Sequence, residues 1–179
     1  MTIWTVGHST RTISEFIELL KAHEIAVLAD VRRFPGSRRH PQFGQDQLAS
    51  SLEKEQIRYL HFAELGGRRA TRPDSPNTTW RNAAFRGYAD HMMTAPFPRA
   101  AEQLLALART TRTAMMCAEA LWWRCHRALI ADYLKAAGHE VLHIVNHEKI
   151  ENHPFTSAAR VIDGKLSYRA AQMEELPLA

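Results

Sequence analysis

The chain has 179 residues, of which 45% are hydrophobic and 23% charged, with a formal net charge of +4 and an isoelectric point near 9.3. This balance is typical of one globular domain, and no apolar run reaches the roughly 18 residues that a membrane span needs. The start "MTIWTVGHST" lacks the charged and apolar regions of a secretion signal. We therefore expect a cytoplasmic protein with reduced cysteines and no membrane partner.

Strand-like and helix-like patterns alternate along the chain. Continuous apolar runs indicate buried strands, while apolar residues at helical spacing, with a capping box at Thr12 and Glu15, indicate helices. The predicted strands are 2–7, 25–31, 57–62, 113–117 and 140–145, with a last strand or hairpin within 159–168. The predicted helices are 12–23, 45–55, 82–94, 98–109 and 125–137.

This alternation predicts the fold class: an α/β single-domain sandwich with a mostly parallel sheet of five to six strands, flanked by helices. The domain is expected to span residues 1–179, because no linker, repeat or low-complexity tract interrupts it. Residues 63–96 form a long excursion that holds Gly66, Gly67 and Gly87. We expect that this excursion could close over a site as a lid.

The residues that follow each predicted strand define the candidate site, because parallel strands end at one edge of the sheet and ligands bind there. They are His8 and Ser9 after the first strand; Asp30, Arg32 and Arg33 at the second; Glu64, Gly66 and Gly67 after the third; Cys117 and Glu119 at the fourth; and Cys125, His126 and Arg127 at the start of the next helix. The start of a helix also favours an anion.

Arginines cluster in the loops near these strand ends. One cluster lies within 32–39 and another within 68–86, and aromatic residues such as Phe34 and Trp122 lie close by in the sequence. Arginine binds phosphate in a planar, bidentate way, and aromatic rings stack on nucleobases. The pattern therefore favours a nucleotide or a nucleic acid as the partner.

Several motifs resemble those of a known family. They are "VGHST", "ADVRRFPGSRRHPQF", "LGGRR", "FRGYADHM", "MCAE", "CHR" and "HPFTSAARVIDGKLSY". In this order, from Gly7 to Tyr168, they resemble the bacterial and archaeal family DUF488. The resemblance implies an α/β fold and marks these motifs as family hallmarks. It implies no reaction, so the chemistry must be argued from residue types.

In the leading interpretation, the protein hydrolyses or transfers a group at an N-glycosidic or phosphoester bond of a nucleotide or nucleic acid. The candidate catalytic residues are His8 and His126 for proton transfer, Asp30 or Glu119 as base or cation stabiliser, and Cys117 beside the reacting centre. The candidate substrate-binding residues are Ser9, Arg32, Arg33, Arg38, Glu64, Gly66, Gly67, Arg68, Arg124, Cys125 and Arg127. Asp30 equally fits a structural ion pair with an arginine.

Two alternatives stay open at this point. In the first, the protein is a thiol-dependent enzyme with Cys117 as nucleophile and Cys125 as resolving thiol. In the second, it is a non-catalytic nucleic-acid-binding module. Cys117, Glu119, Cys125 and His126 also have the donor types of a metal site, but their C-x7-C-H spacing is not a familiar zinc pattern. We predict no metal and no cofactor.

Overall fold

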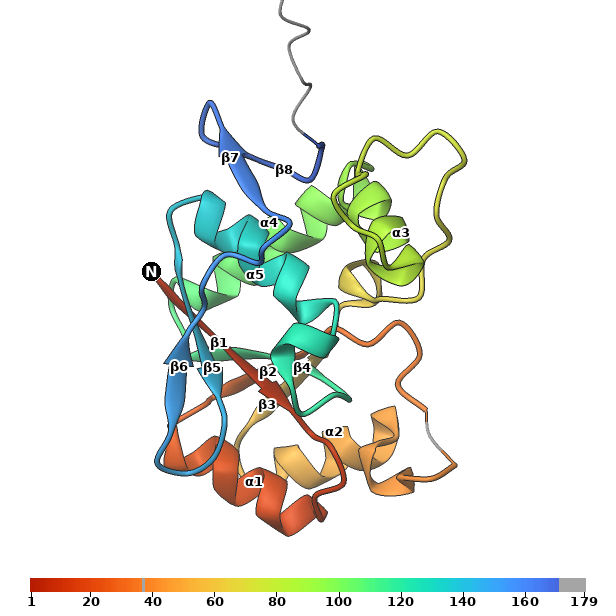
Figure 1. The fold of residues 1–179 in the computed structure, drawn as a ribbon. Coiled ribbons are helices and arrows are strands. Elements are labelled where there is room, and N and C mark those ends of the chain that lie inside the picture. Colours follow the sequence, from red (N-terminus) through yellow and green to blue (C-terminus); the bar gives the residue numbers. More distant parts are fainter. Residues whose placement is uncertain (37, 171–179) are drawn as a thin grey trace, which may run out of the picture.

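The computed structural model describes residues 1–36 and 38–170 of the chain (Figure 1). In chain order the elements are β1 (Thr2–Gly7), α1 (Ile13–Ala22), β2 (Val27–Asp30), the 3-10 helix η1 (Pro41–Phe43), α2 (Gln45–Glu53), β3 (Arg58–His61), η2 (Ala63–Leu65), α3 (Ala83–Met92), α4 (Pro96–Ala108), β4 (Thr113–Cys117), η3 (Trp122–Arg124), α5 (Arg127–Ala136), β5 (Glu140–Ile144), β6 (Ile150–Asn152), β7 (Arg160–Ile162) and β8 (Lys165–Ser167).

Six strands form one sheet in the order β3-β2-β4-β1-β5-β6. The first five strands of the chain pair in parallel, and β6 is antiparallel to β5. The predicted α/β fold with a mostly parallel sheet in a single domain is therefore confirmed. Gly7 pairs with Cys117, and Asp30 pairs with both Met116 and His61. This register places the carboxyl ends of four strands at one edge.

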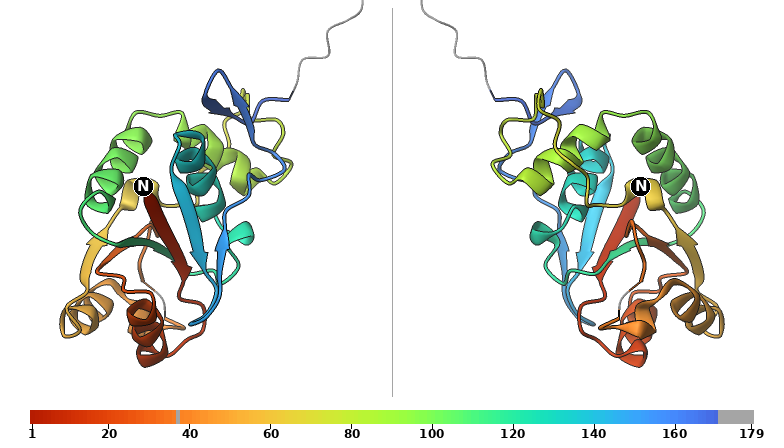
Figure 2. Two further views of the ribbon diagram at one scale, coloured as in Figure 1. Left: turned by 90° about the vertical axis from the view of Figure 1, so that its left-hand side faces the viewer. Right: turned by 90° about the vertical axis from the view of Figure 1, so that its right-hand side faces the viewer.

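Helices cover both faces of the sheet (Figure 2). On one face, α1 and α2 bury Phe16 and Leu48 against Trp4 and Val6 of β1. On the other face, α3, α4 and α5 form a second core with Ile3 and with residues of β2 and β4. The alternation of side chains along each strand thus feeds two separate cores.

Local sequence signals explain where the elements begin and turn. The Thr12 side chain accepts from the Glu15 backbone N–H, and the Glu15 carboxylate accepts from Thr12, so the predicted capping box starts α1. The predicted hairpin is present as β7 and β8, although it forms its own sheet. Asp163 and Gly164 both have positive φ, as a tight hairpin turn requires.

Strand β6 was not predicted. It has only three residues, too few to show a period, and it follows a turn in which the Asn146 side chain accepts from the backbone N–H groups of Glu148 and Lys149. The turn returns the chain along β5 and adds an antiparallel edge strand. Hydrogen bonds from an Asn side chain to the following backbone are common in short turns. They can reveal the turn, but they do not reveal which strand the chain pairs with afterwards.

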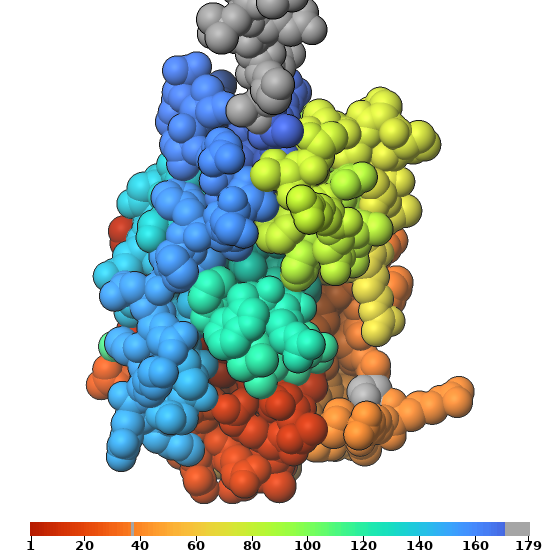
Figure 3. All heavy atoms as spheres, viewed as in Figure 1, coloured from red at the N-terminus to blue at the C-terminus, as the bar shows by residue number. Residues whose placement is uncertain are grey.

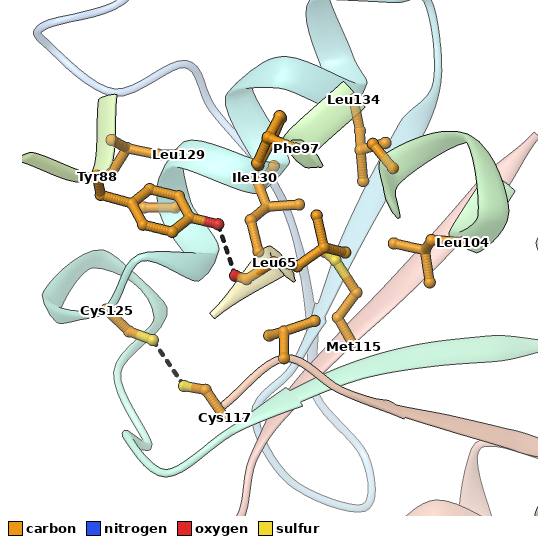
Figure 4. Packing of buried hydrophobic residues seen from close by; sticks show 14 of the residues in the cluster. Leu65, Tyr88, Phe97, Leu104, Met115, Cys117, Cys125, Leu129, Ile130 and Leu134 are labelled. Carbon is orange, nitrogen blue, oxygen red and sulfur yellow. Dashed lines mark hydrogen bonds between the residues drawn. The ribbon is translucent and has the colours of Figure 1, made fainter. Parts of the chain in front are cut away.

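Hydrogen bonds to backbone carbonyls tie the two ends of the excursion 63–96 to each other. The Tyr88 hydroxyl donates to the Leu65 carbonyl at 2.7 Å, and His91 Nε2 lies 2.6 Å from the Glu64 carbonyl. The hydroxyl bond is drawn in Figure 4. Closure of this segment as a lid stays a prediction.

The chain turns to opposite faces of the sheet after β1 and after β4, although these strands are neighbours. After β1 it enters α1 on one face, and after β4 it enters α5 on the other. Such a point, where connections diverge, leaves a crevice at the carboxyl ends of the two strands. The crevice lies between His8 and the loop after Cys117.

Gly7 allows the ends of β1 and β4 to approach closely, and we expect Gly7→Ala to destabilise the fold. A Cβ at this position would lie 1.9 Å from the Glu119 carbonyl oxygen, so the backbone must move. We expect a loss of about 1–3 kcal/mol in the free energy of unfolding, measured by urea denaturation. Gly36→Ala is the matched control, because no described atom other than those of Gly36 and its chain neighbours lies within 4 Å of its added Cβ. Equal stability of the two variants would contradict this close approach.

Candidate functional site

A pocket of about 280 Å³ lies in the crevice between the ends of β1 and β4. Its lining residues are His8, Arg32, Arg33, Phe34, Gly36, His40, Gly67, Arg68, Cys117, Ala118, Glu119, Cys125 and His126. Figure 3 shows the face on which the teal segment after β4 lies centrally, with the orange segment near residue 40 projecting beside it. Segments far apart in the sequence therefore meet at one site.

Two thiols form the floor of this pocket. Cys117 ends β4 and Cys125 lies just before α5, and their Sγ atoms are 2.7 Å apart (Figure 4). The Arg127 backbone N–H donates to Cys125 Sγ at 3.5 Å. Cys125 thus lies where a helix start and a cationic side chain both favour negative charge.

The pKa values of the two thiols are shifted in opposite directions. Burial would raise the pKa of Cys125, but the hydrogen bond from Cys117 and the charge of Arg127 outweigh it and lower this pKa to about 7. Burial raises the pKa of Cys117 well above its usual value, and its hydrogen bond to Cys125 adds to the effect. Of the two thiols, Cys125 is therefore the one that loses its proton more readily.

The His126 ring faces Cys125 in a fixed orientation. Its Nε2 lies 2.8 Å from the carbonyl oxygen of Val31, so this nitrogen carries the proton and donates it. Its Nδ1, 3.4 Å from Cys125 Sγ, is then an acceptor for the thiol proton. Burial lowers the pKa of His126, which keeps the ring neutral. A nucleophile next to a base that a third group orients is the arrangement of covalent catalysis.

Gly67 leaves the space that the His126 ring occupies. A Cβ at Gly67 would lie 2.8 Å from His126 Nδ1. Gly66 is equally restricted, because its Cβ would lie 2.5 Å from the Arg33 Cα atom. The "LGGRR" motif therefore needs its two glycines because atoms of Arg33 and His126 lie too close to leave room for a Cβ. Gly67 lines the pocket, whereas Gly66 packs beneath the loop of Arg33 and does not.

His8 lies on the other side of the pocket. Its ring stacks on Phe43 at 4.0 Å, its Nδ1 lies 2.9 Å from the Ser9 carbonyl, and its Nε2 lies 3.4 Å from Arg32 Nη1. Burial lowers the pKa of His8 to about 4, although the Ser9 hydrogen bond opposes this effect. The neutral ring fixes the wall of the pocket. Ser9 itself lies outside the lining.

Asp30 is engaged by other protein groups. Its carboxylate accepts from Arg32 Nε at 2.9 Å and from the Tyr59 hydroxyl at 2.7 Å, and Asp30 is fully buried. Burial raises the pKa of Tyr59, and the nearby Asp30 raises it further. This geometry matches the structural ion pair that the sequence left open for Asp30. Arg32 lines the pocket, but its guanidinium is already paired with Asp30.

Arg127 also binds protein groups. Its guanidinium is almost fully buried and donates to Thr5 Oγ1 at 3.2 Å and to the Glu119 carbonyl at 2.5 Å. It therefore shapes the loop after β4 from beneath. Arg124, in contrast, is exposed in η3 and lies outside the pocket lining.

The remaining candidates divide between the mouth of the pocket and the surface beyond it. Arg33, Arg68 and Glu119 are exposed and line the pocket. Glu64 is exposed outside the lining and lies 3.8 Å from Arg69 in an ion pair. Arg38 is exposed and also lies outside the lining.

Sequence reasoning left four lining residues out of the candidate set. They are Phe34, Gly36, His40 and Ala118. The first three belong to "ADVRRFPGSRRHPQF", where the density of arginines directed attention mainly to the charged positions, and Ala118 has no polar side chain to mark it. The signal that could have found them is their place in a loop that begins at the end of a buried strand.

Two searches of the described residues bear on metals and membranes. In residues 1–36 and 38–170, no three His, Cys, Asp or Glu side chains are grouped so that they could hold a metal ion. Within the same ranges, no helix combines the length and the apolar character that a membrane crossing requires.

The fold and this crevice define an α/β protein with a cationic, thiol-containing pocket between two parallel strands whose following connections diverge. The family model described as "Domain of unknown function DUF488" matches residues 12–134, more than half of the chain. The chain therefore belongs to the DUF488 family, as its motifs suggested. The late motif "HPFTSAARVIDGKLSY" lies outside the matched residues. No curated protein and no solved structure matches the chain.

The opposite acidities of the two thiols predict selective labelling. With the protein at constant concentration, we expect iodoacetamide to alkylate Cys125 at a rate that rises with pH through a midpoint of about 7, because the thiolate is the reactive form. Cys117 is expected to label far more slowly over the same range. Peptide mass spectrometry distinguishes the two sites. Faster labelling of Cys117 would contradict the assignment.

Proposed function

We propose that the protein is a thiol-dependent enzyme in which Cys125 is the nucleophile. The observation that carries this proposal is the contact of Cys125 Sγ with both Cys117 Sγ, at 2.7 Å, and His126 Nδ1, at 3.4 Å, on the floor of the pocket. This assignment reverses the roles that the sequence suggested for the two cysteines. The acidities favour the reversal, since the pKa is lowered at Cys125 and raised at Cys117.

The chemistry follows from the oriented His126 ring. In the protonated form of Cys125, His126 Nδ1 takes the thiol proton while Sγ attacks the electrophilic atom of the substrate, so that the ring is charged only during the reaction. The bond to the leaving group breaks, and the His126 proton passes to that group. Because burial lowers the pKa of His126, the protonated ring is a strong proton donor. Water then hydrolyses the thiol adduct and frees Cys125. The exposed Glu119 carboxylate at the mouth of the pocket is placed to activate that water.

The surroundings of the pocket support an anionic substrate. Arg33 and Arg68 are exposed cations at its mouth, and Phe34 offers a ring that is 63% exposed. A phosphate suits the arginines, and a nucleobase suits the aromatic ring. We therefore propose a nucleotide or a nucleic acid as the substrate class. The bond attacked is proposed to be phosphoester or N-glycosidic.

A binding-only function has one observation in its favour. The basic surface extends beyond the pocket through the exposed Arg38, Arg39 and Arg124. A protein that binds a strand of nucleic acid would require such a surface. In that case the thiols contribute nothing to function. Measured turnover of a substrate distinguishes the enzyme from the binding-only protein.

Binding and turnover are expected to depend on different residues. Arg33→Ala and Arg68→Ala should each weaken AMP or single-stranded oligonucleotide binding about tenfold, because a charge-assisted hydrogen bond is lost. Isothermal titration calorimetry measures this change. Arg160→Ala, an exposed arginine of the β7–β8 hairpin, is the control and should bind as the wild type does. Equal affinity of all three variants would show that the pocket mouth is not the binding site.

Cys125→Ser is expected to abolish turnover on a panel of nucleoside phosphates and oligonucleotides, by on the order of a thousandfold or more, with binding retained. Cys117→Ser is the matched control. It keeps a hydrogen-bond donor beside Cys125, and we expect a loss of about tenfold or less. The opposite result would identify Cys117 as the nucleophile. Full turnover in both variants would leave the thiols without a catalytic part.

A further inference from the structure

A buried chain of hydrogen bonds leads away from the pocket floor. Arg127 donates to Thr5 Oγ1 at 3.2 Å, and Thr5 Oγ1 lies 2.7 Å from His143 Nδ1. His143 Nε2 lies 2.9 Å from His153 Nδ1, and His153 Nε2 lies 3.0 Å from Asp132 Oδ1. All five residues are buried. This chain of hydrogen bonds starts at Arg127 in α5 and passes through β1, β5 and the residue after β6. It ends at Asp132, which is again in α5.

The protons in this chain have a consistent order. Burial, together with nearby His153 and Arg127, lowers the pKa of His143 to about 2, so its ring is neutral. Because a guanidinium can only donate, Thr5 Oγ1 accepts from Arg127, and its own proton is available to His143 Nδ1. His143 Nε2–H then donates to His153 Nδ1, and His153 Nε2–H donates to Asp132. Every donor meets an acceptor from the cation at one end to the carboxylate at the other.

Each end of the chain is held by further contacts. Asp132 also accepts from the Thr156 backbone N–H at 2.9 Å and from the Tyr168 hydroxyl at 2.8 Å. Trp122, in the loop between the two cysteines, stacks on His143 with ring centroids 4.4 Å apart. The ring covers the middle of the chain. These contacts hold the side chains of the network in place.

Arg127 links this chain to the thiols. Among the described residues, its Nε is a buried N–H without a hydrogen-bond partner. Burial lowers the pKa of Arg127, but its interactions with Cys117 and Cys125 raise it above the usual value. A thiolate at Cys125 would thus compensate the buried positive charge of Arg127.

We infer that Thr5, His143, His153 and Asp132 are positioning residues that hold the Arg127 guanidinium beside the two cysteines and thereby set how much of Cys125 is thiolate. This inference rests on the proposed function, because it concerns the nucleophile of that site. Asp132 acts through four intervening hydrogen bonds and touches no substrate. A buried cation and a buried carboxylate are joined here through the side chains of Thr5, His143 and His153 instead of a direct ion pair.

Other charged or titratable groups around Cys125 do not replace Arg127. Cys117 of β4 donates a hydrogen bond, and His126 has a neutral ring with its proton held by Val31. Tyr88 of α3 is fully buried and keeps its proton, because burial raises its pKa. His8 and Arg32 lie across the pocket, and the latter is paired with Asp30. Arg33, Arg68 and Glu119 lie exposed at the mouth.

The test compares Thr5→Val with Thr5→Ser. Valine has the shape of threonine without its hydroxyl, so the chain is cut beside Arg127, whereas serine retains it. We expect Thr5→Val to move the midpoint of Cys125 alkylation upward by about one pH unit, which lowers the rate at pH 7 about fivefold. Thr5→Ser should keep the wild-type midpoint. Equal midpoints in the two variants would overturn the inference.

Asp132→Asn tests the far end of the chain. It should shift the midpoint in the same direction, while Tyr168→Phe, which removes a bond to Asp132 outside the chain, should not. A purely structural network would lower the melting temperature of both variants and move neither midpoint. If the wild type shows no midpoint near pH 7, the proposed function fails. If the wild type does and Asp132→Asn leaves it unchanged, only the inference fails. Should Asp132→Asn not fold, the Thr5 pair decides.

Discussion

β1 and β4 run side by side in parallel, and Gly7 lies opposite Cys117 at their carboxyl ends. Their pairing continues past the strands, since the His8 backbone N–H donates to the Cys117 carbonyl at 3.0 Å. The connections then leave on opposite faces of the sheet, so a crevice opens between them. The pocket, the loop after β4 and the start of α5 all take their places from this pairing.

Buried charge is the second organising feature of the molecule. Arg32 is neutralised by Asp30, whereas Arg127 has no direct carboxylate partner among the described residues and lies near two thiols. Burial of an unpaired cation is costly, so its surroundings must supply compensation. Carbonyl oxygens of the loop and the hydroxyl of Thr5 supply part of it, and we propose that a thiolate at Cys125 supplies the rest. The same cation that stabilises the loop thus makes one thiol acidic.

Much of this arrangement could be predicted from the sequence, because apolar periodicity and strand ends are local signals. The alternation of elements gave the parallel sheet, and the sheet gave a shared edge for His8, Cys117 and His126. The roles within the site could not be predicted. Whether Arg127 faces a ligand or the protein depends on packing, and the sequence "RCHR" reads the same in both cases. The chain to Asp132 joins residues that no motif brings together.

The central claim is that Cys125 is a thiolate at neutral pH because of where the fold places it. The most direct measurement is the ultraviolet absorbance of thiolate as a function of pH, in the wild type and in Cys125→Ser. The account predicts one thiolate with a midpoint of about 7 in the wild type and none near that pH in the variant. A thiolate that appears only at the ordinary alkaline pH of a free cysteine, or that persists near pH 7 in Cys125→Ser, would contradict it.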